Sequence, residues 1–216
     1  MPIQPPRVPK RLDPQPLDGL EDRAEHVALA LTGTDLSGQA ARRILFEEVR
    51  LRRVSFAETS LEEIRLLDAE VEESDFSGAV WDRARLTRAA FKNCRLLGLQ
   101  LVEAALQDVR FEDCNLSSAL FIGATCSHLG FDRCVLREAS FQSARLNGAS
   151  FRDCDLSGAD LRGASLKGAD FRGANLSGVQ VGPKDLQGAI IDPSQALQLI
   201  ELFGVRVKDP GEDLED

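Results

Sequence analysis

The sequence predicts an all-β solenoid, a chain wound into a stack of four-sided coils. The first observation is a run of five consecutive pentapeptides from Cys154 to Gly178: C-D-L-S-G, A-D-L-R-G, A-S-L-K-G, A-D-F-R-G and A-N-L-S-G. A period of five fits neither a strand, which alternates every two residues, nor an α-helix, which repeats every 3.6 residues. It fits a coil in which each pentapeptide forms one side and its glycine forms the corner, because a residue without Cβ adopts positive φ at little cost.

The second observation is that the same register continues far beyond this run. Every fifth residue from Leu31 to Ile191 is large and apolar except Ala41 and Cys126, and no insertion or deletion interrupts the count. The large residue and the small residue two positions before it are expected to point into the coil. Four sides make a coil of about twenty residues, so the register predicts about eight coils in a rod roughly 38 Å long.

The third observation is that two kinds of residue recur every twenty positions. They are Phe91, Phe111, Phe131, Phe151 and Phe171, and Cys94, Cys114, Cys134 and Cys154. Residues one coil apart stack in a column at about 4.8 Å, so we expect a phenylalanine column and a cysteine column inside the rod. Neighbouring cysteines in a column are within disulfide reach. We favour free thiols that act as small hydrophobic residues, because an odd number of cysteines does not indicate a disulfide framework.

Four segments follow from these patterns: an N-terminal arm (1–25), the β-helix (26–191), a C-terminal cap (192–208) and an acidic tail (209–216). The arm holds six of the nine prolines together with Arg7, Lys10 and Arg11, which predicts an extended, flexible segment. Contact of this arm with nucleic acid is an alternative, but three positive charges favour a solvated tail. No direct binding of nucleic acid is therefore expected.

The C-terminal cap is predicted to contain a short α-helix and a last strand. Asp192 suits the N-cap, Pro193 the first helical position and Gly204 the position after the last turn. The apolar residues of this segment exceed what the covering of one coil end requires, and an exposed apolar patch usually marks a contact surface. We expect an isologous homodimer joined through the C-terminal ends, with these contact residues: Leu197, Leu202, Phe203, Val205 and Val207.

The formal net charge is −9, yet residues 31–191 are nearly balanced, with twenty Lys or Arg against twenty-three Asp or Glu. Oppositely charged residues in neighbouring coils can pair. One acidic belt is the least explained by pairing, because within its own span it faces a single base, Arg65. We propose it as a partner-binding surface, made of Glu58, Glu62, Glu63, Asp68, Glu70, Glu72, Glu73 and Asp75.

The sequence contains no pattern that indicates catalysis or a cofactor. His26 and His128 are the only histidines, and neither has a second histidine or a suitably spaced cysteine nearby. There is no nucleophile–base arrangement and no glycine-rich phosphate loop, because the glycines lie at repeat corners. No run approaches the roughly twenty apolar residues of a membrane span, and the first thirty residues lack a signal peptide. We expect a non-enzymatic, cytoplasmic protein without metal, cofactor or membrane contact.

The repeat resembles the pentapeptide repeat family over roughly residues 31–191, and the motif is sharpest at 154–178. This resemblance implies a right-handed quadrilateral parallel β-helix. The end of the chain, L-x-G-A-x-I-D at 186–192, the helix containing Gln195 and G-V-x-V at 204–207, resembles the Qnr-type and mycobacterial quinolone-resistance members. Those proteins protect DNA gyrase or topoisomerase IV from poisons, and several are described as dimeric rods that imitate duplex DNA.

The resemblance implies a type II topoisomerase as partner and a DNA-mimicking surface. Two departures weigh against it: the unbroken register lacks the loops that interrupt the Qnr rod, and the net charge of the rod is small for a DNA mimic. The alternative is a generic protein-interaction scaffold with a different partner.

Overall fold

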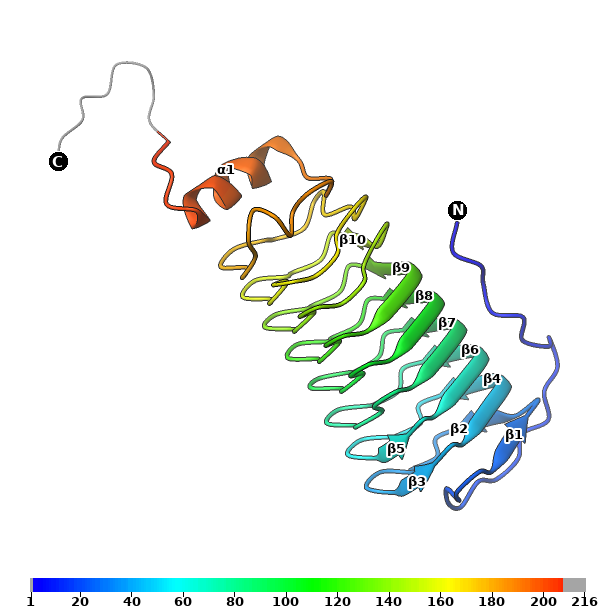
Figure 1. Ribbon diagram of the computed structural model, residues 1–216. Coiled ribbons are helices and arrows are strands. Elements are labelled where there is room, and N and C mark those ends of the chain that lie inside the picture. The colour runs from blue at the N-terminus through cyan, green and yellow to red at the C-terminus, as the bar shows by residue number, and fades with distance from the viewer. Residues whose placement is uncertain (1, 208–216) are drawn as a thin grey trace.

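The computed structural model describes residues 2–207 of this chain. The predicted acidic tail, residues 209–216, lies outside the described residues. The chain forms a rod of stacked coils with one helix at its C-terminal end (Figure 1). Its elements are β1 (Glu25–Val27), β2 (Ala30–Thr32), β3 (Ala40–Arg42), β4 (Leu45–Arg52), β5 (Ser60–Glu62), β6 (Arg65–Glu72), β7 (Arg85–Lys92), β8 (Ala105–Glu112), β9 (Thr125–Asp132), β10 (Ser150–Arg152) and α1 (Pro193–Leu202).

Every strand pairs in parallel with the strand one coil away. The main sheet has the order β1-β4-β6-β7-β8-β9-β10, with β2 also on β4, and β3 pairs with β5 on another side. In each pair the partners are twenty residues apart, as with Phe111 and Phe131. Single bridges at the same spacing continue the stack to the pairing of Asp170 with Ile190. The expected quadrilateral β-helix is therefore confirmed, together with the C-terminal helix.

The inside of the rod is filled by the residues that the five-residue register predicts. The central side chains are buried from Leu31 to Leu176, and the residues two positions before them are buried from Ile44 to Val179. The apolar inward positions at 181–191 are partly buried. Phe91 stacks on Phe111 with ring centroids 4.9 Å apart, and Phe151 stacks on Phe171 at 4.8 Å. Trp81 is also enclosed, and its indole N–H donates to the hydroxyl of Thr59 at 3.1 Å. The predicted phenylalanine column is confirmed.

The cysteine column is buried as predicted, and its thiols are free. Each Sγ donates to the carbonyl two residues earlier, for example Cys114 to Glu112 at 3.2 Å and Cys154 to Arg152 at 3.2 Å. Cysteine thus acts here as a small residue that also satisfies a corner carbonyl. Burial raises the pKa of Cys126, which lies outside the column, to about 12. Such a thiol stays protonated and unreactive at neutral pH.

The N-terminal arm is extended, as expected, and in the structure it is docked on the rod. Residues 2–16 lie along the outside of the rod, beside the strand ladder, and run from the β1 end toward β9 (Figure 1). The carbonyl of Ala30 accepts a hydrogen bond from Gln15, and the amide of Gln4 reaches the carboxylate of Asp108 much farther along the rod. A proline-rich segment is extended even in isolation, so little conformational freedom is lost when it docks.

The C-terminal cap is a helix without the predicted last strand. Asp192 is the N-cap and forms a capping box with Gln195, and Gly204 follows the C-cap with φ of 76°. Residues 205–207 form no strand. Gln195, which is buried, donates to the carbonyls of Phe171 and Ala174 at 2.6 and 2.7 Å. No helix within residues 2–207 is long and apolar enough to cross a membrane.

Candidate partner-binding surfaces

The acidic belt is paired with arginines of the preceding coil. Residues twenty positions apart lie side by side on neighbouring coils, so Arg42, Arg43, Arg50 and Arg52 stand next to acidic residues of the belt. The N···O distances are 3.0 Å for Arg42–Glu62, 2.7 Å for Arg43–Glu63, 2.8 Å for Arg50–Glu70, 3.9 Å for Arg52–Glu72 and 3.4 Å for Arg52–Glu73.

The following coil supplies further arginines to the belt. Arg88 binds Asp68 with two hydrogen bonds of 2.6 Å, and Arg95 lies 3.5 Å from Asp75. Arg83 also pairs with Glu62. The interpretation that pairing explains this belt least was wrong, because the bases that pair with it lie on the neighbouring coils and not within its own span. In the described part of the chain, Glu58 is the belt residue without an ion pair.

The belt also does not form one surface. Glu62 belongs to β5 in the two-stranded sheet, whereas Glu72 ends β6 in the main sheet. The two residues are ten positions apart, which is half a coil, so they lie on opposite sides of the rod. One flat partner surface can therefore contact either the Glu62–Glu63 side or the Glu70–Glu73 side.

Asp68 differs from the rest of the belt because it is buried. Its residue exposure is 6%, and Arg88 together with the amide of Arg7 satisfies its carboxylate. The hydrogen bonds from Arg88 lower the pKa of Asp68. This residue is therefore part of the rod's support, and while the arm is docked its carboxylate is not exposed to a partner.

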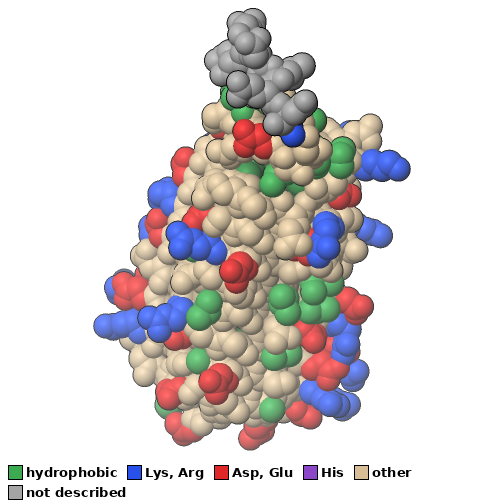
Figure 2. All heavy atoms as spheres, turned by 90° about the vertical axis from the view of Figure 1, so that its left-hand side faces the viewer, with side chains coloured by type: hydrophobic (Ala, Val, Ile, Leu, Met, Phe, Trp, Pro, Cys, Tyr) green, Lys and Arg blue, Asp and Glu red, His purple; other side chains and the backbone are tan. Residues whose placement is uncertain are grey.

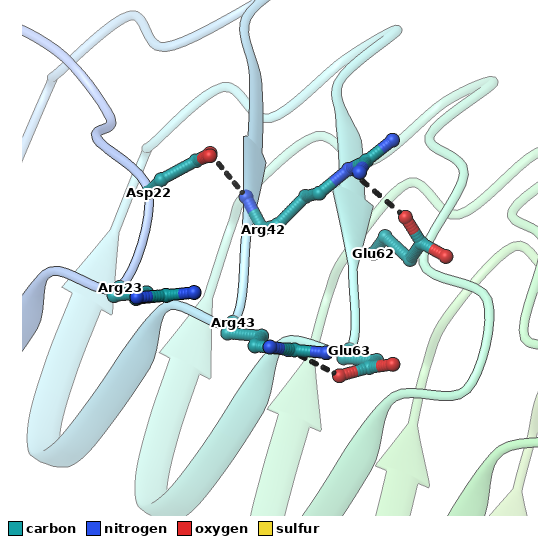
Figure 3. Close-up of a pocket in the computed structure, with 6 residues that line it drawn as sticks. All are labelled: Asp22, Arg23, Arg42, Arg43, Glu62 and Glu63. Atoms are coloured by element: carbon teal, nitrogen blue, oxygen red, sulfur yellow. Dashed lines mark hydrogen bonds and ion pairs between the residues drawn. The ribbon is translucent and has the colours of Figure 1, made fainter.

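The surface around Glu62 and Glu63 is a recess of alternating charge. Figure 3 shows Arg42 pointing to Glu62 and Arg43 pointing to Glu63, while Asp22 accepts the amide hydrogen of Arg42 at 2.8 Å. Arg23 completes the lining. On the face seen in Figure 2, Lys or Arg and Asp or Glu side chains likewise alternate along both edges. The rod therefore presents mixed charge and no broad patch of one sign on this face.

The C-terminal end carries most of the exposed large apolar side chains. The predicted dimer-contact residues are 37–53% exposed, and they are joined by two residues that the sequence analysis did not include, Ile190 and Ile200. Helix α1 contacts the last coil through Gln195 and Leu199, which are its buried residues. Most of the large apolar residues of this segment therefore face outward. The exposed set is Ile190, Leu197, Ile200, Leu202, Phe203, Val205 and Val207.

Some residues that the structure brings together were missed. Asp68, Asp108 and Gly130 hold the N-terminal arm, and His128 contacts Asp108 at 3.1 Å. Two features of the sequence could have indicated that a segment docks here: two corner aspartates forty residues apart, and a glycine inside a strand. Among the described residues, 2–207, no group of three His, Cys, Asp or Glu could hold a metal ion.

Three solved structures that are similar to this chain are the following. A trypsin-treated variant of QnrB1, a plasmid-mediated fluoroquinolone resistance protein, has 20% identity and a TM-score of 0.44, over 85% of this chain and 99% of that chain. HetL, a pentapeptide repeat protein involved in heterocyst differentiation regulation from the cyanobacterium Nostoc sp. strain PCC 7120, has 24% identity and a TM-score of 0.33, over 79% and 90%. A pentapeptide repeat protein of the Arabidopsis thaliana thylakoid lumen has 24% identity and a TM-score of 0.26, over 63% and 68%.

No curated protein sequence matches the chain. Residues 139–178 match the family model described as pentapeptide repeats, with eight copies, and residues 81–141 match the model described as a pentapeptide repeat region. The same five-residue register and twenty-residue pairing extend on both sides of these matches. Residues 81–178 therefore consist of pentapeptide repeats, and the coil geometry continues the same repeat beyond them.

Proposed function

We propose that the protein is a non-enzymatic binding rod whose partner is a type II topoisomerase, with DNA gyrase as the first candidate. It would protect this enzyme from a poison, an antibiotic or a toxin, by occupying its DNA-binding surface. The observation that carries the proposal is the apolar surface at one end of a charged rod. Two rods joined there form a body of about twice the length, with the elongated shape of a short DNA duplex.

The dimer is isologous, so that helix α1 of one copy lies against helix α1 of the other. Light scattering at micromolar concentration should give twice the chain mass, and the double substitution Leu197→Asp and Val205→Asp should give the single chain mass. Both positions are about half exposed, so the substitutions do not disturb the core. A wild-type protein with the mass of one chain would contradict the dimer.

The carboxylates on the Glu70–Glu73 side are the proposed contacts for the partner. Exposed ion pairs in proteins contribute only about 0–1 kcal/mol each, so a strongly basic surface can take these carboxylates from Arg50 and Arg52. Binding would then weaken steeply with salt, because the attraction is between exposed charges. The acidic tail, brought close to its copy in the dimer, is the second contact.

The test is DNA supercoiling by gyrase in the presence of a poison. Wild-type protein should restore supercoiling, and the variant Glu72→Lys with Glu73→Lys should not. The matched control is Glu62→Lys with Glu63→Lys, which makes the same charge change on the opposite side and should still protect. Equal protection by wild type and both variants would remove the belt from the mechanism.

The second candidate is an interaction scaffold with a different protein partner. The arginine partners of the belt favour it, because seven of its eight carboxylates are paired within the rod. Failure of the wild-type protein to act on any type II topoisomerase would select this candidate, and capture of partners from the native host would then identify the target. The topoisomerase proposal places the protein in the cytoplasm.

A further inference from the structure

The N-terminal arm occupies a long groove on the outside of the rod. Pro14 forms a bridge with Ala30 near the start of the β-helix, and the side chain of Ile3 lies against Gly130 in β9. Ala30 and Gly130 are in the same column, with Arg50, Glu70, Ala90 and Arg110 between them. The arm therefore spans five coils and runs in the direction opposite to the growth of the rod.

Two buried carboxylates hold the backbone of the arm. The amide of Gln4 donates to Asp108 at 3.0 Å, and the amide of Arg7 donates to Asp68 at 2.9 Å. Asp108 and Asp68 are only 2% and 6% exposed. Each carboxylate is also held by the residue one coil further along the rod, Asp108 by His128 at 3.1 Å and Asp68 by Arg88 at 2.6 Å. The two acceptors are thus fixed in place and directed toward the arm.

The spacing of these acceptors matches the repeat of a polyproline-II chain. Gln4 and Arg7 are three residues apart, and a polyproline-II chain advances about 9.3 Å in three residues. Asp68 and Asp108 are two coils apart, and two coils advance about 9.6 Å. The prolines between the two donors, Pro5 and Pro6, have no amide hydrogen that would require a partner. Any chain in this conformation can repeat the same pair of hydrogen bonds.

Gly130 provides the apolar end of the groove. A Cβ at this position would lie 2.8 Å from Cδ1 of Ile3, so a side chain there would displace the Ile3 side chain from its present position. Gly130 is buried within a strand and its φ is not positive, so the turn geometry of the coil does not require glycine. A glycine inside a strand often marks a site where another chain comes close. The recess continues past Pro2 along Arg110, Ser150 and Arg152.

We propose that this groove is a binding site for a proline-rich, polyproline-II segment of a partner protein, and that residues 2–10 occupy it as an internal competing ligand. The site recognises two features of its ligand. One is an apolar side chain that lies against Gly130, and the other is a pair of backbone N–H groups three residues apart. The arm's own Gln4 and Pro5 side chains are exposed, so their identity matters little. Basic residues such as Arg7 in the ligand complement the negative charge of Asp68. This site borders the proposed topoisomerase surface, because Glu70 lies in the column that the arm follows.

The test uses the full chain with its arm released. The double substitution Gln4→Pro and Arg7→Pro removes both amide donors while the arm stays extended, because proline favours the same conformation. A fluorescent peptide of residues 2–12 is titrated by fluorescence polarisation into this variant and into the wild type. The internal arm reduces the apparent affinity of the wild type in proportion to its occupancy, so we expect at least about tenfold weaker binding to the wild type than to the variant.

Two matched controls define specificity. A peptide with proline at both donor positions should bind the released variant at least about tenfold more weakly, and the additional substitution Gly130→Val in the rod should also abolish binding of the native peptide. Unchanged circular dichroism of each variant shows that the rod is folded. No binding of the native peptide to the released variant, or equal binding of both peptides, would overturn the proposal. A species of twice the mass with exchanged arms would also overturn it, because the occupant would then be a second copy.

Discussion

Two parts of the rod, which we call the first and second half although the second is shorter, build the same coil corner from different residues. From Arg43 to Ser143 the corner residues with positive φ carry side chains, except at Gly78, Gly98 and Gly123. From Gly148 to Gly178 they are glycines, except at Asp153. A left-handed backbone costs a non-glycine residue about 1 kcal/mol or more. The corners of the first half are therefore strained, and interactions of their side chains, which glycine cannot make, offset this cost in free energy.

The difference is visible in how the charges pair. In the first half, corner residues reach to the next coil, as Arg88 does to Asp68 and Arg133 to Asp113 at 2.8 Å. In the second half, aspartates pair with an arginine two residues later in the same coil, as Asp160 does with Arg162. Corner side chains thus link neighbouring coils only where glycine is absent, and the arm docks only on that half.

The largest expected effect concerns the lumen, which is the same in both halves. Leu116 and Leu156 belong to one column, are fully buried, and differ in the corner that follows, which is Ser118 in one coil and Gly158 in the other. Each substitution by alanine should cost about 2–5 kcal/mol because it leaves a cavity. Urea unfolding should give equal losses for the two variants. Clearly unequal losses would show that corner type affects the packing inside.

The next largest effect on the free energy of unfolding distinguishes a buried ion pair from an exposed ion pair of the same coil. Asp68 and Glu70 each pair with an arginine twenty residues away, but their side chains are 8% and 41% exposed. Asp68→Ala leaves Arg88 and the amide of Arg7 without their partner and should cost about 2–3 kcal/mol. Glu70→Ala should cost less than about 1 kcal/mol. Similar unfolding free energies for the two variants would contradict the structural role of Asp68.

Acid should weaken the local pairs of the second half. The hydrogen bond from Arg162 holds the pKa of Asp160 to about 2, below its usual value of about 3.9. Such a carboxylate stabilises the folded state above its unfolded pKa, and this contribution is lost as the pH falls toward about 2. The difference in unfolding free energy between wild type and Asp160→Asn should be constant above pH about 5 and vanish in strong acid. A difference independent of pH would refute the pairing.

The smallest effect exchanges the corners themselves. Ser118 and Gly158 share a column, with φ of 55° and 69°. Gly158→Ser should destabilise the rod by about 1 kcal/mol because serine is strained at positive φ. Ser118→Gly should be nearly neutral, since relief of strain is offset by the greater freedom of glycine in the unfolded chain. Thermal unfolding of the two variants measures both; a stabilising Gly158→Ser would show that corner strain does not distinguish the halves.

The coil could be predicted from the sequence because one short register determines which side chains point inward. The ion pairs of the belt could also have been predicted, since Arg42 and Glu62 are twenty residues apart in the sequence. That prediction requires a comparison of residues in neighbouring coils. The docking of the arm could not be predicted from the sequence, because it depends on the match between the repeat length of a polyproline-II chain and the height of two coils.

Hydrogen exchange of the arm tests most directly the claim that corner side chains of the first half organise the surface of the rod. In the full chain, the amides of Gln4 and Arg7 should exchange much more slowly than the amide of Lys10, which donates no hydrogen bond within residues 2–207. Asp108→Asn should accelerate exchange at Gln4 more than at Arg7. Exchange of all three amides at the rate of an unstructured peptide would contradict the account.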